Sequence, residues 1–150
     1  MVGIIYNTIM NVYSIVVDTN VIVAALRSRR GASFRLLMLL GSKAFQVHVS
    51  VPLVLEYEDA SKRLVGDIPL TVHDIDDILD YICSVAEHQE LYYLWRPQLR
   101  DPEDDMVLEL AVAAHCDFIV TYNARDFSGT DRFGIKVLTP KEFLLLIGEL

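Results

Sequence analysis

The sequence predicts an α/β fold built on a mainly parallel sheet of about five strands. Short apolar runs rich in β-branched residues recur along the chain, and such runs favour buried strands. Between them lie segments whose apolar residues recur every three or four positions, the pattern of a helix with one buried face. Strands that alternate with helices form parallel sheets covered by helices. With 150 residues, 53% of them hydrophobic, the chain has the size of one domain with its own core.

Five strands are predicted from the apolar runs. They occupy residues 12–17, 45–51, 90–95, 118–121 and 136–138. The first strand is expected to end in a turn at residues 18–20. Residues 1–11 form an N-terminal extension, and a single domain spans residues 12–150.

Four helices are predicted from apolar residues at helical spacing. The first opens at Pro52, because proline is favoured in the first turn of a helix. The second starts at Thr71, which forms a capping-box-like pair with Asp74. The third opens in the acidic run at residues 101–105, where negative charge suits the helix dipole. The fourth runs from Pro140 to about residue 147.

The charge of the chain is unevenly distributed. A formal net charge of −8 argues against binding a polyanion, because Lys and Arg dominate the attraction to nucleic acid. Residues 27–63 nevertheless carry seven basic and three acidic side chains, whereas residues 66–109 carry twelve acidic and two basic ones. This asymmetry is compatible with a molecule that meets phosphate on one side only.

Acidic and amide side chains follow several of the predicted strands. Asp18 ends the first strand, the acidic run at 101–105 opens a helix, and Asn123 and Asp126 follow the strand at 118–121. In open parallel sheets, ligands bind beyond the carboxyl ends of the strands, where the strand-to-helix loops converge. These side chains are therefore expected to gather at that edge.

Two acidic residues fall on the apolar side of their predicted helices. Glu56 is either a site residue or a buried glutamate paired with an arginine or with the backbone. Asp104 is favoured over Asp105 because the residues three, four and seven positions after Asp104 are apolar. A one-residue shift of the helix would reverse that choice. Asp101 is assigned to the helix cap.

Carboxylates gathered in one pocket repel one another and raise each other's pKa unless a cation is present. Mg²⁺ and Mn²⁺ prefer oxygen ligands, and Mg²⁺ binds through a few carboxylates together with substrate phosphate. One or two such ions could activate a water and stabilise the leaving oxygen of a phosphodiester. The pattern therefore indicates a metal-dependent hydrolase without a covalent nucleophile.

Four segments resemble PIN domains in their order and spacing. They are IVVDTN (15–20), LEY (55–57), DPEDD (101–105) and IVTYNARDF (119–127). The likeness covers residues 12–147 and is greatest to the bacterial branch of toxin components related to VapC-type toxins. It implies a three-layer α/β/α fold and a ribonuclease that depends on magnesium or manganese.

The resemblance also implies roles for particular residues. Asp18, Glu56 and Asp104 match the first three acidic positions of the family, and Asp126 would supply the fourth. Many relatives have Asp where this chain has Asn123, so either Asn123 or Asp126 completes the site. Supporting roles are implied for Thr19 or Asn20 at the first aspartate and for Thr121 at the last loop. Asp101, Asp105 and Asn123 are counted as supporting residues from their places beside the acidic positions.

The family further implies a homodimer and often a small antitoxin whose arm blocks the acidic pocket. An RNA backbone would be bound by the arginines beyond the first strand, with a solvated basic loop as the alternative. These arginines are Arg27, Arg29, Arg30 and Arg35.

Cys83 and Cys116 match no metal or redox spacing, and the N-terminal stretch has neither a signal-peptide nor a membrane-span pattern. A cytoplasmic protein is expected.

Three rival interpretations fit less well. A receiver-like signalling domain needs a Lys after a late strand, but residues 64–135 contain none. A dehalogenase-type phosphatase needs a second Asp where Asn20 stands. A zinc site built from histidines is the third interpretation, but the four histidines of the chain lack zinc-ligand spacing. A PIN scaffold that binds RNA or protein without cutting remains open, because Asn123 replaces an acid.

Overall fold

Five strands form one sheet, and every described pair of neighbours runs parallel. The computed structural model describes residues 12–91, 99 and 101–150, so the predicted extension at residues 1–11 lies outside it. The strand order is β3-β2-β1-β4-β5, which confirms the predicted parallel sheet. The strands are β1 (Tyr13–Val17), β2 (Phe45–Val49), β3 (Glu87–His88), β4 (Phe118–Val120) and β5 (Lys136–Leu138).

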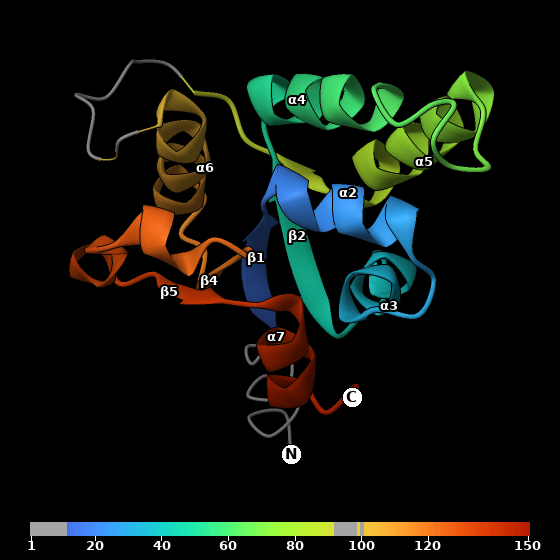
Figure 1. The fold of residues 1–150 in the computed structure, drawn as a ribbon. Coiled ribbons are helices and arrows are strands. Elements are labelled where there is room, and N and C mark those ends of the chain that lie inside the picture. Colours follow the sequence, from blue (N-terminus) through green and yellow to red (C-terminus); the bar gives the residue numbers. More distant parts are fainter. Residues whose placement is uncertain (1–11, 92–98, 100) are drawn as a thin grey trace.

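Helices cover both faces of the sheet. In Figure 1, α6 lies on one side of the central strands and α2, α3 and α5 lie on the other. Helix α6 packs against β1, β2 and β4, which gives the three-layer arrangement. The described helices are α2 (Thr19–Arg27), α3 (Ala32–Leu39), α4 (Val51–Lys62), α5 (Val72–Val85), α6 (Pro102–Ala113) and α7 (Pro140–Leu146), with 3-10 turns η1 (Ala124–Phe127) and η2 (Thr130–Phe133).

The central strand β1 is buried over its second half. Ile15 and Val16 are fully buried, as expected for a parallel strand covered on both faces. At the amino ends of β2 and β4, the ring of Phe143 from α7 contacts Phe45 and Phe118 edge-on, with ring centres 5.2 and 5.9 Å apart. These contacts hold α7 against the sheet.

Three predicted helix starts are confirmed by their caps. The Thr71 hydroxyl accepts a hydrogen bond from the Asp74 backbone N, and Asp74 accepts one from the Thr71 backbone N, at 3.1 and 2.8 Å. Thr139 and Glu142 form the same capping box at the start of α7. The Asp101 side chain accepts a hydrogen bond from Glu103 N at 2.9 Å, as predicted for a cap of α6.

The structure corrects two of the predicted elements. The turn expected at residues 18–20 is wrong, because α2 begins at Thr19 with Asp18 as its cap. Helix α3 also lacks a counterpart among the predicted elements. The predicted strand at residues 90–95 is wrong at Glu90 and Leu91, which form neither strand nor helix, and its remaining residues lie outside the described part of the chain.

The strand order creates a switch point between β1 and β4. From β1 the chain proceeds to β2 and β3 on one side, and then crosses to β4 and β5 on the other. The loops after β1 and β4 therefore leave in opposite directions and open a crevice at the carboxyl edge. Asp18 follows β1 and Thr121 follows β4, so both stand at this crevice.

None of the helices in the described ranges is long and apolar enough to cross a membrane.

A buried tyrosine ties α4 to the end of β1. Tyr57 is 1% exposed, and its hydroxyl donates a hydrogen bond to the backbone oxygen of Val17, the residue before Asp18. Helix α4 is thereby held against the strand end that carries the first carboxylate.

We expect Tyr57→Phe to lower the free energy of unfolding by about 1–3 kcal/mol, because the buried Val17 oxygen loses its donor. Urea denaturation measures this loss. Tyr13→Phe is the matched control, since the Tyr13 hydroxyl makes no hydrogen bond with any described residue. Equal losses in the two variants would contradict this role for Tyr57.

Candidate functional site

The site is built around Asp18, a carboxylate that is only 8% exposed. Its Oδ1 accepts a hydrogen bond from Thr19 N at 2.8 Å. Its Oδ2 accepts one from Thr121 Oγ1 at 2.7 Å and a longer one from Asn20 Nδ2 at 3.4 Å. Burial and the charges of Asp126 and Glu103 raise the pKa of Asp18, whereas the hydrogen bonds from Thr121 and Thr19 counteract that rise.

The loop after β4 is tied to the start of α2 by the same polar atoms. Asn20 Nδ2 donates to Thr121 Oγ1 at 3.2 Å, and Asn20 Oδ1 accepts from Tyr122 N at 3.3 Å. Thr121 Oγ1 also accepts from Asn123 N at 3.1 Å. Asn20 and Thr121 therefore fix the separation between the two loops that border the crevice.

Glu56 reaches the crevice from α4. Burial raises its pKa to about 7, together with a hydrogen bond to Glu103 and the charges of Glu103 and Asp18. The Thr19 hydroxyl lies near enough to lower that pKa somewhat, although Thr19 Oγ1 is buried and has no hydrogen bond of normal geometry. Among the described residues Glu56 forms no ion pair with an arginine, so that alternative has no support.

The two neighbouring aspartates of α6 have different surroundings. Burial, and then the charges of Asp18, Asp101 and Asp126, raise the pKa of Asp104 to about 7. Asp105 instead accepts a hydrogen bond from Leu99 N at 2.9 Å. Asp104 therefore shares the electrostatic environment of Asp18, while Asp105 holds the chain that enters α6.

Asp126 lies in η1 and is exposed. Its backbone N donates to the Asn123 oxygen at 3.0 Å, within the tight turn that follows β4. Its charge raises the pKa values of both Asp18 and Asp104. The carboxylate of Asp126 is therefore close enough to act on both residues, whereas Asn123 brings no charge.

Glu103 belongs to the same group and is absent from the residues predicted by sequence. It stands in the first turn of α6 and contributes to the raised pKa values of Glu56, Asp18 and Asp104. Its place in the acidic run at 101–105 indicated that Glu103 lies near the site. Its closeness to a residue of α4 depends on tertiary structure and has no local signal.

The donor chemistry of the crevice suits a hard divalent cation. In the described ranges no Lys, Arg or His forms an ion pair with Asp18, Glu56, Asp104 or Asp126. The buried Thr19 hydroxyl without a partner adds another oxygen. Mg²⁺ and Mn²⁺ bind such oxygens. As they stand, no three acidic, His or Cys side chains of the described part are close enough together to hold a metal ion.

The four arginines beyond β1 are divided between helices and a turn. Arg27 ends α2 and Arg35 lies inside α3, so the predicted basic loop is limited to Arg29 and Arg30. Arg35 pairs with Glu149 at 3.1 Å. A shallow hollow of about 400 Å³ is bordered by Arg29, Arg30 and Arg35.

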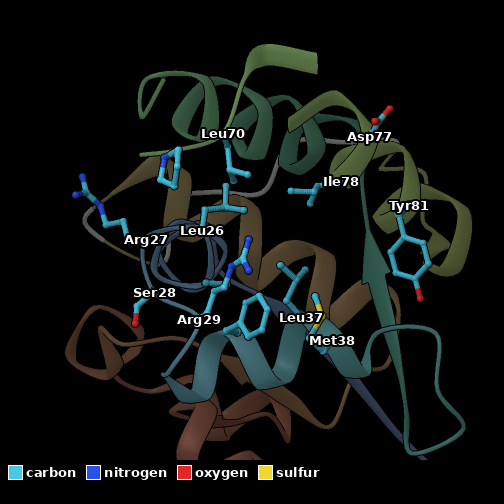
Figure 2. A pocket seen from close by; sticks show the side chains of 13 residues that line it. Leu26, Arg27, Ser28, Arg29, Leu37, Met38, Leu70, Asp77, Ile78 and Tyr81 are labelled. Atoms are coloured by element: carbon cyan, nitrogen blue, oxygen red, sulfur yellow. The ribbon is translucent and has the colours of Figure 1, made fainter. Parts of the chain in front are cut away.

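A large pocket lies away from the carboxylates. It has a volume of about 690 Å³ and sits at the far end of α2, between α3 and α5 (Figure 2). Its walls are mainly apolar, with Leu26, Leu37 and Ile78 among them, and Arg27 and Arg29 come from the loop end. Asp18 caps the opposite end of α2, so this pocket is separate from the acidic crevice.

Comparison with known families identifies one match. The model of the PIN domain matches residues 14–125, more than half of the chain. The matched range contains Asp18, Glu56, Asp104 and Asn123, and it ends just before Asp126. No curated protein matches the chain.

The raised pKa values generate a prediction about stability. The pKa of Glu56 and of Asp104 is about 7 in the folded protein, above the usual 4.5 and 3.8, so between these values the folded state binds more protons than the unfolded state. We expect the metal-free protein to lose stability as the pH rises from 5 to 8.

Urea denaturation in EDTA at pH 5, 6.5 and 8 measures this loss. Glu56→Gln should flatten the pH dependence, because the group that takes up the proton is removed. Glu58→Gln, which alters a residue of α4 paired with Lys62, is the control and should leave the slope unchanged. An unchanged slope in Glu56→Gln would show that Glu56 does not carry the shifted proton.

Proposed function

We propose that this chain, which belongs to the PIN domain family of nucleases, is a metal-dependent endoribonuclease whose active site is the acidic crevice between β1 and β4. The observation that supports the proposal is the buried Asp18 with Glu56, Asp104 and Asp126 near it. Burial and the charges of acidic neighbours raise the pKa values of Asp18, Glu56 and Asp104, and no cationic side chain of the described residues forms an ion pair with them. Such a group of anions favours the binding of a cation, because the cation lowers the repulsion between the carboxylates.

The carboxylates Asp18, Glu56, Asp104 and Asp126 would hold one or two Mg²⁺ or Mn²⁺ ions. When bound, the metal supplies a water activated for attack and neutralises charge on the phosphodiester. Glu103, whose charge contributes to the raised pKa of Glu56, stands beside this group in the first turn of α6.

The chain's own residues prepare this site by orientation. Thr121 and Thr19 N each donate to a different oxygen of Asp18, which fixes the plane of that carboxylate. Asn20 holds the loop after β4 at the edge of the crevice. Oriented, partly buried oxygen ligands bind a metal with less reorganisation than mobile ones.

The substrate proposed is RNA, and the protein is proposed to be the toxin of a cytoplasmic toxin-antitoxin pair related to VapC-type toxins. Arg29 and Arg30, which pair with no described carboxylate, would contact phosphates before the crevice. An antitoxin that inhibits the enzyme would have to place a cationic side chain among the carboxylates. The homodimer implied by the family is part of the same proposal.

The first prediction from this proposal separates the two neighbouring aspartates of α6. Asp104→Asn should lower kcat for RNA cleavage in Mn²⁺ by at least about 100-fold, because loss of a metal ligand exceeds the 10- to 100-fold effect of its supporting residues. Asp105→Asn is the matched control and should lower stability through its bond to Leu99 N while kcat changes little.

Cleavage is measured on a panel of structured and single-stranded RNAs with Mn²⁺, Mg²⁺ or EDTA. Metal-dependent cutting by the wild type and by Asp105→Asn, but not by Asp104→Asn, is the expected result. Cutting that persists in EDTA would contradict metal dependence. Absence of cutting with every metal would favour a PIN scaffold that binds without cleaving.

A further prediction concerns the residue that orients Asp18. Thr121 is fully buried, and Thr121→Val keeps its shape but removes the 2.7 Å hydrogen bond to Asp18 Oδ2. We expect the Mn²⁺ concentration for half-maximal cleavage to rise about 10- to 100-fold. Thr130→Val, a buried threonine that bonds only to Ile135 O among the described residues, is the control; an equal rise there would refute a specific role for Thr121.

A further inference from the structure

An exposed aromatic ring stands at the edge of the acidic crevice. Tyr122 directly follows Thr121, whose hydroxyl bonds to Asp18, and precedes Asn123. The residue is 47% exposed, which leaves much of its apolar ring in water. Neither the carboxylate group nor the hydrophobic core accounts for a large aromatic side chain at this position.

Tyr122 is held at both ends. Its backbone N donates to Asn20 Oδ1 at 3.3 Å, which links it to the residues around Asp18. Its hydroxyl lies 2.6 Å from the hydroxyl of Ser33, a side chain of α3 that is 2% exposed. The ring is therefore fixed between the loop after β4 and the start of α3, although its surface remains open.

A ring fixed in this way is pre-organised to bind a flat partner. The rotational freedom that a tyrosine loses on binding has already been lost in the free protein, which favours association. The surroundings of the ring indicate what the partner is. The crevice beside it is anionic and would repel phosphates in the absence of a metal. The affinity of the protein for RNA must therefore come partly from uncharged contacts. A nucleobase provides such a contact through stacking.

Two basic residues lie just before the helix that holds the ring. Arg29 and Arg30 precede Gly31, which caps the start of α3, and Ser33 is in the first turn of that helix. A single strand that passes from these arginines to the carboxylates would therefore cross Tyr122. Double-stranded RNA would present no free base face to the ring, because its bases are stacked.

We propose that Tyr122 is a stacking platform for the nucleobase next to the scissile phosphate, and that it gives the site a preference for single-stranded RNA. The inference rests on the proposed ribonuclease function and adds a substrate-binding residue to it. Ser33 acts as a positioning residue, because it holds the ring by its hydroxyl.

The test compares binding and cleavage of two short fluorescent RNAs, one intact and one with a single abasic nucleotide beside the cleavage position. Binding is measured by fluorescence anisotropy with Ca²⁺, and kcat and KM are measured with Mn²⁺. Tyr122→Leu removes the ring, and Tyr122→Phe keeps it. Tyr81→Leu is the matched control, because Tyr81 is 48% exposed, bonds through its hydroxyl to Leu40 O at 2.7 Å, and lies at the distant apolar pocket (Figure 2).

We expect Tyr122→Leu to weaken binding of the intact RNA by about 5- to 150-fold, the range for loss of one stacked base, mostly as a rise in KM. The abasic RNA should bind the wild type and Tyr122→Leu equally, since the ring and the base act as a pair. Tyr122→Phe should keep most of the difference between the two RNAs, and Tyr81→Leu all of it.

The outcomes separate this inference from the proposed function. If the wild type cuts RNA with metal but Tyr122→Leu discriminates between the intact and abasic RNAs as the wild type does, the stacking role is wrong and the nuclease stands. If Tyr122→Leu loses affinity equally for both RNAs, the ring has only a structural role and the inference is also overturned. If the wild type neither binds nor cuts any RNA, both proposals fail.

Discussion

The burial of the Asp18 carboxylate where the loops after β1 and β4 separate is the constraint on which the rest of the site depends. A charged group taken from water must be compensated by hydrogen bonds or by an opposite charge. Thr19 N, Asn20 and Thr121 supply the hydrogen bonds, and these same bonds join the loops after β1 and β4. The polar network therefore solvates the carboxylate and also shapes the crevice.

The other carboxylates add to the electrostatic cost of this arrangement. Glu56 comes from α4, and Asp104 comes from the first turn of α6. Burial and acidic neighbours raise the pKa of each of these two carboxyls to about 7. The bond from Tyr57 to Val17 O and the packing of α6 on the central strands hold these groups in place against their repulsion. A cation would relieve the repulsion that the fold maintains.

The sequence was sufficient for the features that depend on local pattern. The apolar run of β1, the capping box at Thr71 and the cap at Asp101 are short-range signals, and each was found where expected. Helix α2 was missed because Asp18, Thr19 and Asn20 are residues of turns as well as of helix starts. Contacts between distant segments had no local signal: Tyr122 meets Ser33 across 89 positions of sequence, and Glu103 meets Glu56 only because α6 and α4 pack together.

The central claim is that the carboxylates of the crevice give up protons to a divalent cation. Calorimetric titration of Mn²⁺ into the metal-free protein, at pH 6.5 in two buffers of different ionisation enthalpy, tests it directly. Two of the carboxyls have pKa values of about 7, so the account predicts that Mn²⁺ binding releases protons at pH 6.5. The measured heat should then differ between the two buffers at pH 6.5, and this difference should disappear at pH 9, where the carboxyls are already ionised. Absence of Mn²⁺ binding at both pH values, or binding whose heat is the same in both buffers at pH 6.5, would contradict it.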